Sequence, residues 1–137
     1  MKNKGFTLIE LLAVIVILAI IALITTPMIL GVIDTAKRGS AESSALGYVE
    51  SVEKSIMIQQ VTDETKTVAA GTYTVDANGD LKSGSTVVVD VDFKGAIPTG
   101  SVTIGSNGAV SGASLTFATI HANVVTVNAD GTATIAS

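Results

Sequence analysis

The chain of 137 residues contains no cysteine and no tryptophan, only one histidine and two prolines, and 4% aromatic residues. Without cysteine there are no disulfide bridges and no thiolate metal sites, although the compartment stays open. With one histidine, His121, any Ser-His-Asp set would have to be built on that residue. The net charge of −4 argues against a broad basic patch for nucleic acid. We therefore predict no cofactor and no direct nucleic-acid partner.

The chain does have one long hydrophobic segment near its N-terminus. Every residue from Leu11 to Ile24 is apolar. The run resumes after Pro27 as far as Ile33, giving about 28 residues from Phe6, enough to cross a bilayer core of about 30 Å. An ordinary secretory signal would carry a small-residue cleavage site after the apolar core, and the sequence there does not fit one. The segment is therefore predicted to span a membrane.

The orientation of this segment follows from the charges beside it. Lys2 and Lys4 precede the apolar run, which places the N-terminus in the cytoplasm by the positive-inside rule. Lys37 and Arg38 on the far side make the asymmetry modest. We expect the C-terminal part of the chain outside the cell. A plain signal anchor would explain the segment equally well, except for Glu10 and the residues before it.

Glu10 is a carboxylate at the head of an apolar helix. Asp or Glu within a membrane helix costs roughly 2.5 to 3.5 kcal/mol on insertion scales, and it persists where a positive group answers it. The neighbouring sequence offers no such group, except the amine that cleavage before Phe6 would create. The alternative is a side chain that reaches the interface from near the cytoplasmic end of the helix. Glu10 is therefore expected to need a partner.

The residues Lys4 to Leu12, Lys-Gly-Phe-Thr-Leu-Ile-Glu-Leu-Leu, resemble the N-terminal signature of type IV pilins and of the pseudopilins of secretion and competence systems. The resemblance covers residues 1–33. It implies that a prepilin peptidase cuts between Gly5 and Phe6 and that the same enzyme methylates the amine of Phe6. It also implies that Glu10 acts in assembly, by meeting the amine of its own or a neighbouring subunit.

Pro27 lies inside the apolar helix, where many members of the resembling family carry a helix-breaking proline. Proline removes a backbone donor and clashes with the preceding turn, so a kink or a local opening is predicted. The hydroxyls of Thr25 and Thr26 offer substitute hydrogen bonds. A tolerated kink without a role is the alternative. The family often has a glycine where this chain has Ala19, which leaves open whether the helix melts between Ala19 and Pro27.

Beyond Gly31 the apolar pattern becomes amphipathic. Apolar residues recur at spacings of three and four, which predicts that the helix continues to about Gln60 with one face covered. Such a helix would be roughly 80 Å long. Glu50 and Lys54 are spaced for a supporting ion pair. The apolar stripe comprises Ala45, Val49, Val52 and Ile56, with Leu46 and Val61 close to it, and the polar side comprises Glu42, Glu50, Glu53 and Lys54.

The remaining residues predict short strands joined by tight turns. Three pairs, Asn78-Gly79, Asn107-Gly108 and Asp130-Gly131, are strong hairpin signals flanked by β-forming residues, and they predict a small meander. Thr86–Phe93 reads as a further strand, with Val87, Val89, Val91 and Phe93 on one face and Val88, Asp90 and Asp92 on the other. Leu115 and Phe117 mark another strand. The inward faces are expected to cover the helix around Val49, Val52 and Ile56.

The predicted fold class is therefore α+β. A long N-terminal α-helix, membrane-spanning in its first half and amphipathic in its second, packs on a small C-terminal antiparallel sheet, and the resemblance identifies this arrangement as the pilin fold. The predicted segments are a leader at 1–5, a transmembrane and assembly helix at 6–33, an amphipathic half at 34–62 and a β-rich head at 63–137.

Candidate sites for chemistry are few. His121 is expected at the surface or half-buried at a strand end, without a role. Asp76-Ala77-Asn78-Gly79-Asp80 places oxygen ligands at alternate positions as a calcium loop does, but the downstream bidentate Glu is missing and a hairpin fits better. Asp90 and Asp92 look like paired acids, although a solvated sheet face that blunts aggregation is favoured. We predict no catalytic residue and no metal site, so the protein is not expected to be an enzyme.

The resemblance implies a structural subunit of a type IV pilus, held as a precursor in the cytoplasmic membrane and polymerised into an extracellular helical filament for adhesion, motility or uptake. The implied partners are further copies of the chain, prepilin peptidase/methyltransferase, the pilus assembly platform and minor pilins. The cysteine-free head, rich in Thr and Gly, is similar to pilins of Gram-positive bacteria. The alternatives are a pseudopilin of a type II secretion or competence system, a membrane-anchored surface-binding module that does not polymerise, and an enzyme domain on an anchor.

Overall fold

The computed structural model of the chain describes residues 4–137. Residues 1–3 lie outside the described part. They include Lys2, which was used to predict the orientation, and the first part of the predicted leader. The chain divides into two compact units, one ending at Ala36 and the other comprising Lys37–Ser137, which we call the head. The segment boundaries given above stay predictions.

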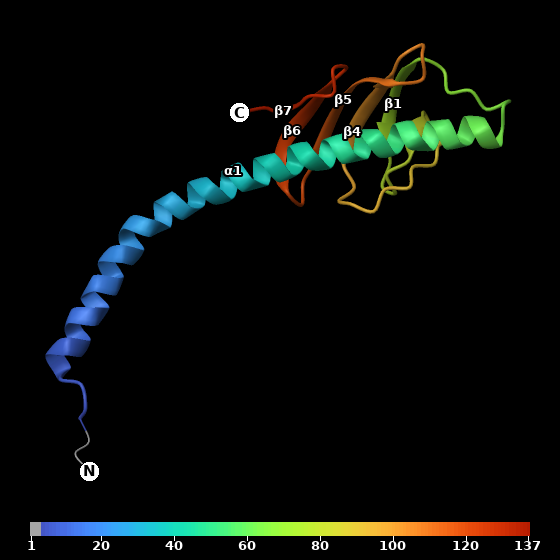
Figure 1. The fold of residues 1–137 in the computed structure, drawn as a ribbon. Coiled ribbons are helices and arrows are strands. Elements are labelled where there is room, and N and C mark those ends of the chain that lie inside the picture. Colours follow the sequence, from blue (N-terminus) through green and yellow to red (C-terminus); the bar gives the residue numbers. More distant parts are fainter. Residues whose placement is uncertain (1–3) are drawn as a thin grey trace. The chain divides into compact units, whose positions relative to one another are not determined.

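One long helix is followed by a seven-stranded sheet, which confirms the predicted α+β fold (Figure 1). The helix α1 (Leu8–Thr62) begins and ends close to the predicted positions and reaches into the head. All strands of the described chain lie in the head. They are β1 (Gly71–Val75), β2 (Leu81–Ser83), β3 (Thr86–Val89), β4 (Thr99–Ile104), β5 (Val110–Phe117), β6 (His121–Asn128) and β7 (Ala133–Ile135).

The sheet has the strand order β3-β2-β1-β4-β5-β6-β7, and every neighbouring pair is antiparallel. The chain proceeds outward from β1 to the edge strand β3, returns through residues 90–98, and places β4 beside β1. It then proceeds to the opposite edge at β7. The single meander predicted from the three turns is therefore wrong: the sheet consists of two meanders that meet where β1 pairs with β4.

All three predicted hairpin turns are confirmed, and they share one backbone pattern. In the first, the Asp76 N–H donates to the Asp80 carbonyl at 3.0 Å, and the Gly79 N–H donates to the Asp76 carbonyl at 3.1 Å. Of the described residues only glycines have positive φ, and here Gly79 has φ +94°. This is a type I turn followed by a glycine bulge, so only the glycine adopts the left-handed conformation. The corresponding glycines of the other two turns are Gly108 and Gly131.

The strand predicted over Thr86–Phe93 is shorter than expected, because β3 ends at Val89. Val89 and Val91 are buried and Phe93 is half-buried, as predicted, but Val87 is 46% exposed rather than inward-facing. Two local features account for the exposure of Val87 and for the early end of the strand. The pairing of β3 with β2 shifts register near Leu81, which breaks the alternation of faces. Beyond the strand, the Asp80 carboxylate accepts the Val91 N–H at 2.9 Å and replaces a strand partner.

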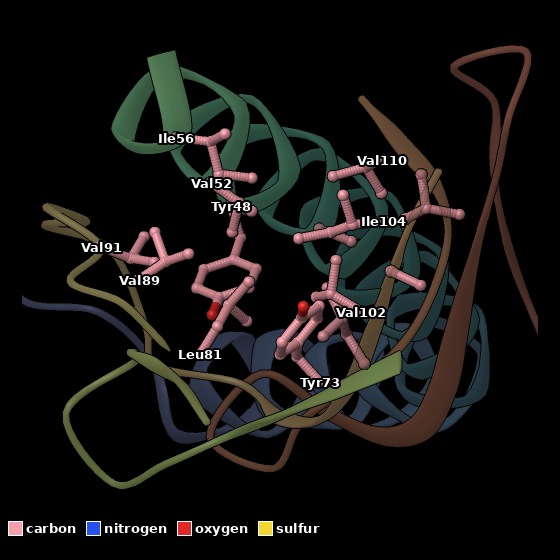
Figure 2. Packing of buried hydrophobic residues seen from close by; sticks show 14 of the residues in the cluster. Tyr48, Val52, Ile56, Tyr73, Leu81, Val89, Val91, Val102, Ile104 and Val110 are labelled. Atoms are coloured by element: carbon pink, nitrogen blue, oxygen red, sulfur yellow. The ribbon is translucent and has the colours of Figure 1, made fainter. Parts of the chain in front are cut away.

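The core of the head forms where α1 lies on the sheet, as predicted. Figure 2 shows Tyr48, Val52 and Ile56 of α1 directed toward strand residues that include Leu81 and Val102. The buried helix residues are spaced by three and four, which is the stripe expected of a half-covered helix. They are Ala41, Ala45, Tyr48, Val52 and Ile56, and Val49 packs partly against them.

Some predictions about the faces of α1 are wrong. Leu46 is 37% exposed and Val61 is 85% exposed, so neither belongs to the stripe. Glu53 was predicted on the solvent side, but its Oε1 accepts the Val110 N–H at 2.9 Å and joins the helix to the start of β5. Among residues 4–137 the ion pair found joins Lys82 to Asp76 at 3.2 Å, so the predicted Glu50–Lys54 pair does not form.

Tyr48 is a core residue that was not predicted from the sequence. Its hydroxyl donates to the buried carbonyl of Gly79 at 2.6 Å, and its ring packs edge-on against Phe93 with centroids 5.4 Å apart. Burial, together with the carboxylates of Asp80 and Asp76, raises the pKa of this phenol above its ordinary value, so the hydroxyl stays a donor. Tyr48 therefore ties the middle of the helix to the first hairpin turn.

The two edges of the sheet are short and are each contacted by a polar side chain of α1. At β3, Gln59 Nε2 donates to the Val88 carbonyl at 3.1 Å. At β7, Arg38 Nη2 approaches the Ile135 carbonyl at 3.5 Å, which is a long contact for a hydrogen bond. The edge strands have four and three residues. Short, partly occupied edges are one way in which proteins discourage pairing with another sheet.

The sheet face opposite the core carries hydroxyl groups in a transverse row. Each residue of this row is the direct cross-strand partner of the next, and the row crosses five strands from β1 to β7. These side chains are small and uncharged, and their hydroxyl groups can bind water. The row accounts for part of the Ser and Thr content of the head. The row consists of Thr74, Ser101, Ser114, Thr126 and Thr134.

Candidate assembly site at the start of the helix

The helix α1 begins with a reciprocal pair of hydrogen bonds between Thr7 and Glu10. Thr7 precedes the first helical residue, and its hydroxyl accepts the Glu10 N–H at 3.3 Å. In return, Glu10 Oε2 accepts the Thr7 N–H at 2.8 Å. The first helical bond follows, from the Leu11 N–H to the Thr7 carbonyl at 3.2 Å. This is a capping box, in which an N-cap Thr and a Glu three residues later satisfy each other's free amide groups.

The capping box gives Glu10 a neutral hydrogen-bond partner, which was not predicted beside the positive partner expected from the sequence. One carboxylate oxygen is bound by the chain's own backbone, without any cleavage. The sequence contained the signal, since Thr7-Leu8-Ile9-Glu10 has the Thr-x-x-Glu spacing immediately before an apolar run. The negative charge itself is still not neutralised by this neutral donor. Glu10 is therefore held in a fixed position while its charge remains available to a cation.

Gly5 and Phe6 lie immediately before this box and are both exposed. A Cβ placed on Gly5 would meet no heavy atom within 4 Å, and Gly5 is not among the glycines with positive φ. Nothing in the fold of the described chain therefore requires glycine at position 5. The side chain of Phe6 is 85% exposed, so this residue is not part of the chain's own core. The described fold therefore gives no structural reason for either residue type at these positions.

The apolar residues after Glu10 are not covered by the rest of the chain. Between Leu11 and Leu30 the large apolar side chains stay about half or more exposed, with Leu23 at 78% and Met28 at 70%. The helix is long and apolar enough to cross a membrane, by length and composition. An apolar surface of this extent, uncovered on every side, marks contact with lipid or with other proteins.

The helix is continuous through Pro27. Thr25 Oγ1 donates to the Ile21 carbonyl and Thr26 Oγ1 to the Ala22 carbonyl, each at 2.6 Å. The threonine bonds predicted here therefore form, but to carbonyls one and two residues before Leu23, whose carbonyl is the one that loses an amide partner at Pro27. The local opening predicted at Pro27 is not seen. A role for Pro27 as a kink and the melting of the helix from Ala19 stay predictions.

The acidic turn of the head serves the hairpin. Asp76 Oδ1 accepts the N–H groups of Asn78 at 2.8 Å and Asp80 at 3.0 Å, and Oδ2 pairs with Lys82. Burial acts against ionisation of Asp76, but these backbone bonds and Lys82 together hold the pKa of its carboxyl below the usual value. The prediction of a hairpin at this turn is confirmed. No group of three or more His, Cys, Asp or Glu that could hold a metal occurs in the described part of the chain.

The other candidate residues lie apart from one another. His121 is the first residue of β6 and is half-buried, as predicted, and its Nδ1 accepts the Asn123 N–H at 3.2 Å. Asp90 and Asp92 are both exposed, beyond the end of β3. The residues that the sequence singled out are thus brought together only at Gly5 to Glu10.

Comparison with known proteins addresses this N-terminal segment. The prokaryotic N-terminal methylation motif matches residues 1–26, which include the predicted cleavage site, the capping box and most of the apolar helix. No curated protein and no solved structure matches the chain significantly.

Proposed function

We propose that this pilin-like chain, which carries the type IV prepilin signature, is the structural subunit of a type IV pilus. Prepilin peptidase cuts between Gly5 and Phe6, the same enzyme methylates the amine of Phe6, and the mature chains polymerise into an extracellular helical filament. The filament serves adhesion, motility or uptake. The methylation motif at residues 1–26 is the observation that carries this proposal.

The precursor is held in the cytoplasmic membrane. The exposed apolar helix supports this, because its side chains have no other cover in the described chain. Lys4 lies just before the helix and is exposed, in keeping with a cytoplasmic N-terminus. The head then lies outside, where a domain without cysteine folds by packing alone.

Assembly exchanges lipid for neighbouring helices. A contact between two different surfaces of the same chain repeats without closing on itself and so builds a filament. The apolar faces from Leu8 to Leu30 supply the bundle, and Glu10 sets the axial position of each copy. Cleavage before Phe6 creates a cationic amine next to the capping box, and the charge of Glu10 pairs with that amine in its own or a neighbouring copy. Further partners are the assembly platform and minor pilins.

The prepilin signature is common to pilins and to the pseudopilins of type II secretion and competence systems, so a pseudopilin is the alternative. A membrane-anchored surface module that does not polymerise would use the same helix without needing the charge of Glu10. The experiments below separate this module from both filament-forming classes.

Processing is tested by the intact mass of the chain extracted from membranes of its native host. We expect a mature chain that begins at Phe6 and carries one added methyl group. In Gly5→Ala the mass should remain that of the uncut precursor. Gly31→Ala is the matched control, because a Cβ at Gly31 also meets nothing within 4 Å, and it should be processed normally. An uncut wild-type chain would overturn the proposal.

Assembly is tested by filament imaging of Glu10 variants. Gln at this position can still accept the Thr7 N–H and keep the capping box, but it carries no charge. We expect Glu10→Gln and Glu10→Ala to be processed and yet to lose filaments alike, because the charge is what assembly needs. Filaments that persist in both variants would leave the non-polymerising module as the better explanation. Glu50→Ala, which removes an exposed acid from α1, should form filaments.

A further inference from the structure

The head contains an open groove that the mechanism above does not use. It has a volume of about 560 Å³ and lies between the last turns of α1 and the edge strand β3. Its apolar lining is exposed, with Ile58 at 56% and Val87 at 46%. Gln59 bridges the helix and β3 within it through the bond to Val88. Exposed apolar side chains gathered at one place of a hydroxyl-rich head indicate a contact surface.

The rim of this groove is acidic. Three carboxylates line it, those of Asp63, Asp90 and Asp92, against a single cation, Lys66. Asp63 is held by its own turn, where Oδ1 accepts the hydroxyl of Thr65 at 2.6 Å. Asp90 and Asp92 are exposed, and neither takes part in the ion pair found among residues 4–137. The groove therefore fits an occupant with an apolar stem and a positive end, and it disfavours nucleic acid and anionic lipid.

We propose that this groove receives Lys37 of a second copy of the chain, so that the end of one head binds the start of the next. A lysine side chain has the required form, because its methylene stem covers apolar surface while its ammonium reaches the rim. Lys37 is exposed at the first residue of the head, and it stands beside Arg38 in the one pair of consecutive basic residues of the described chain. This inference rests on the proposed filament.

The positions of the two surfaces along α1 fit a staggered stack of parallel copies. All copies leave the membrane in the same direction, so their head helices are parallel. Lys37 and Thr62 are separated by roughly 37 Å of helix at the α-helical rise. A copy shifted by roughly this distance along the helix axis brings its Lys37 to the axial level of the groove of the copy it follows. The contact joins two different surfaces, as a contact that builds a filament must.

The test uses the absence of cysteine from the natural chain, which makes introduced thiols the only ones present. Two singly substituted chains, Lys37→Cys and Asp90→Cys, are produced together in the host, and sheared filaments are treated with a mild oxidant. We expect disulfide-linked dimers on a non-reducing gel. In the matched control, Glu50→Cys replaces Lys37→Cys. Glu50 is exposed and lies about halfway along the head helix, so this pair of variants should give at least about tenfold less dimer.

Charge reversal provides the second measurement. Lys37→Glu, or the pair Asp90→Lys and Asp92→Lys, should lower the yield of sedimented filaments about tenfold or more, because like charges then meet. The combined triple variant should restore most of the yield, whereas Lys54→Glu, the same charge change elsewhere on α1, should have little effect. Near-ultraviolet circular dichroism of the tyrosines of the head verifies folding in each variant.

The outcomes separate this inference from the function on which it rests. Wild-type chains that are not processed or form no filaments would refute the proposed function. Normal filaments that give no dimer, together with normal assembly of Lys37→Glu, would overturn the docking of Lys37 and leave the filament intact. Dimers with charge rescue establish the contact.

Discussion

At the scale of single residues, the bond from Tyr48 to Gly79 is the contact whose loss should be most readily measured. Tyr48→Phe keeps the ring and its packing on Phe93 but leaves the buried Gly79 carbonyl without its donor. We expect the free energy of unfolding of the head to fall by about 1 to 3 kcal/mol. Near-ultraviolet circular dichroism of the full chain in nonionic detergent measures this.

Tyr73→Phe is the matched control for this prediction. Its hydroxyl donates to the Ala69 carbonyl at 2.6 Å, but Ala69 is exposed, so water can replace the lost donor. A loss under about 1 kcal/mol is expected. Because each variant retains one tyrosine and the chain has no tryptophan, the signal still comes from the head. Equal losses in the two variants would mean that the Gly79 bond contributes no more than an exposed one.

How well individual residues could be predicted depended on whether their role was local. The roles proposed for Gly5, Phe6 and Glu10 follow from a contiguous motif, and the capping by Thr7 could equally be predicted from its spacing to Glu10. The bond from Glu53 to the Val110 amide could not be read, because its partner lies 57 positions away along the chain. Tyr48 was missed for the same reason, since its partner belongs to a turn placed by tertiary packing.

At the scale of elements, glycines of the sheet should differ in what they tolerate. Gly131→Ala introduces a Cβ into open space at φ +82°, and only the left-handed backbone opposes it, at about 1 to 2 kcal/mol. Gly79→Ala adds a Cβ 3.2 Å from Ile97 Cδ1 and should cost more. In Gly100→Ala the Cβ would lie 2.0 Å from the Ser114 carbonyl oxygen and should prevent the pairing of β4 with β5.

Thermal unfolding midpoints of the three variants measure this order of destabilisation, and Gly112→Ala is the control. Gly112 also lies in a strand, but its φ is not positive, and an added Cβ would be 3.6 Å from the Val127 carbonyl oxygen. Its midpoint should stay near that of the wild type. A Gly100→Ala midpoint above that of Gly131→Ala would contradict the geometry of the β4–β5 pair.

The helix and most of the strands were predictable from the sequence, but which strands pair in the sheet was not. A sustained apolar run and a repeat of three and four define α1, and each Asn-Gly or Asp-Gly pair defines a hairpin. The pairing of β4 with β1 left no such signal, because the two strands are brought together by residues 90–98 without regular structure. Val87 was misplaced because the alternation rule assumes an unbroken register, whereas the register shifts where β3 meets β2.

At the scale of the whole molecule, the head should be stable near neutral pH and lose stability in acid. Hydroxyl and backbone donors of Thr132 and Thr65 hold the pKa of Asp130 and of Asp63 below the ordinary value of 3.8. The pKa of Asp76 is also below its ordinary value, although burial acts in the opposite direction. A carboxyl whose pKa is lower in the folded state stabilises the fold above its unfolded pKa. That stabilisation is lost as the pH falls through the folded value.

The expected profile is therefore flat from neutral pH to about pH 5, with a decline that begins near pH 4. In a triple variant with Asn at positions 63, 76 and 130 the decline should be shallower, because these groups no longer bind protons, and the stability at pH 7 should be lower. The measurement is the unfolding midpoint by tyrosine circular dichroism between pH 2 and 7. A triple variant with an unchanged slope would assign the acid loss to other groups.

The polar contacts that α1 makes at both edges of the sheet bear on the precursor stage that the proposed function includes. Precursors crowded in one membrane present the same short strands to each other at high local density, and open strands would let their heads fuse into aggregates. Gln59 donates to a carbonyl of β3, and Arg38 approaches a carbonyl of β7. Both contacts thus disfavour pairing between the sheet edges of neighbouring heads, and the proposed assembly, which takes up subunits one at a time, requires a supply of such separate molecules.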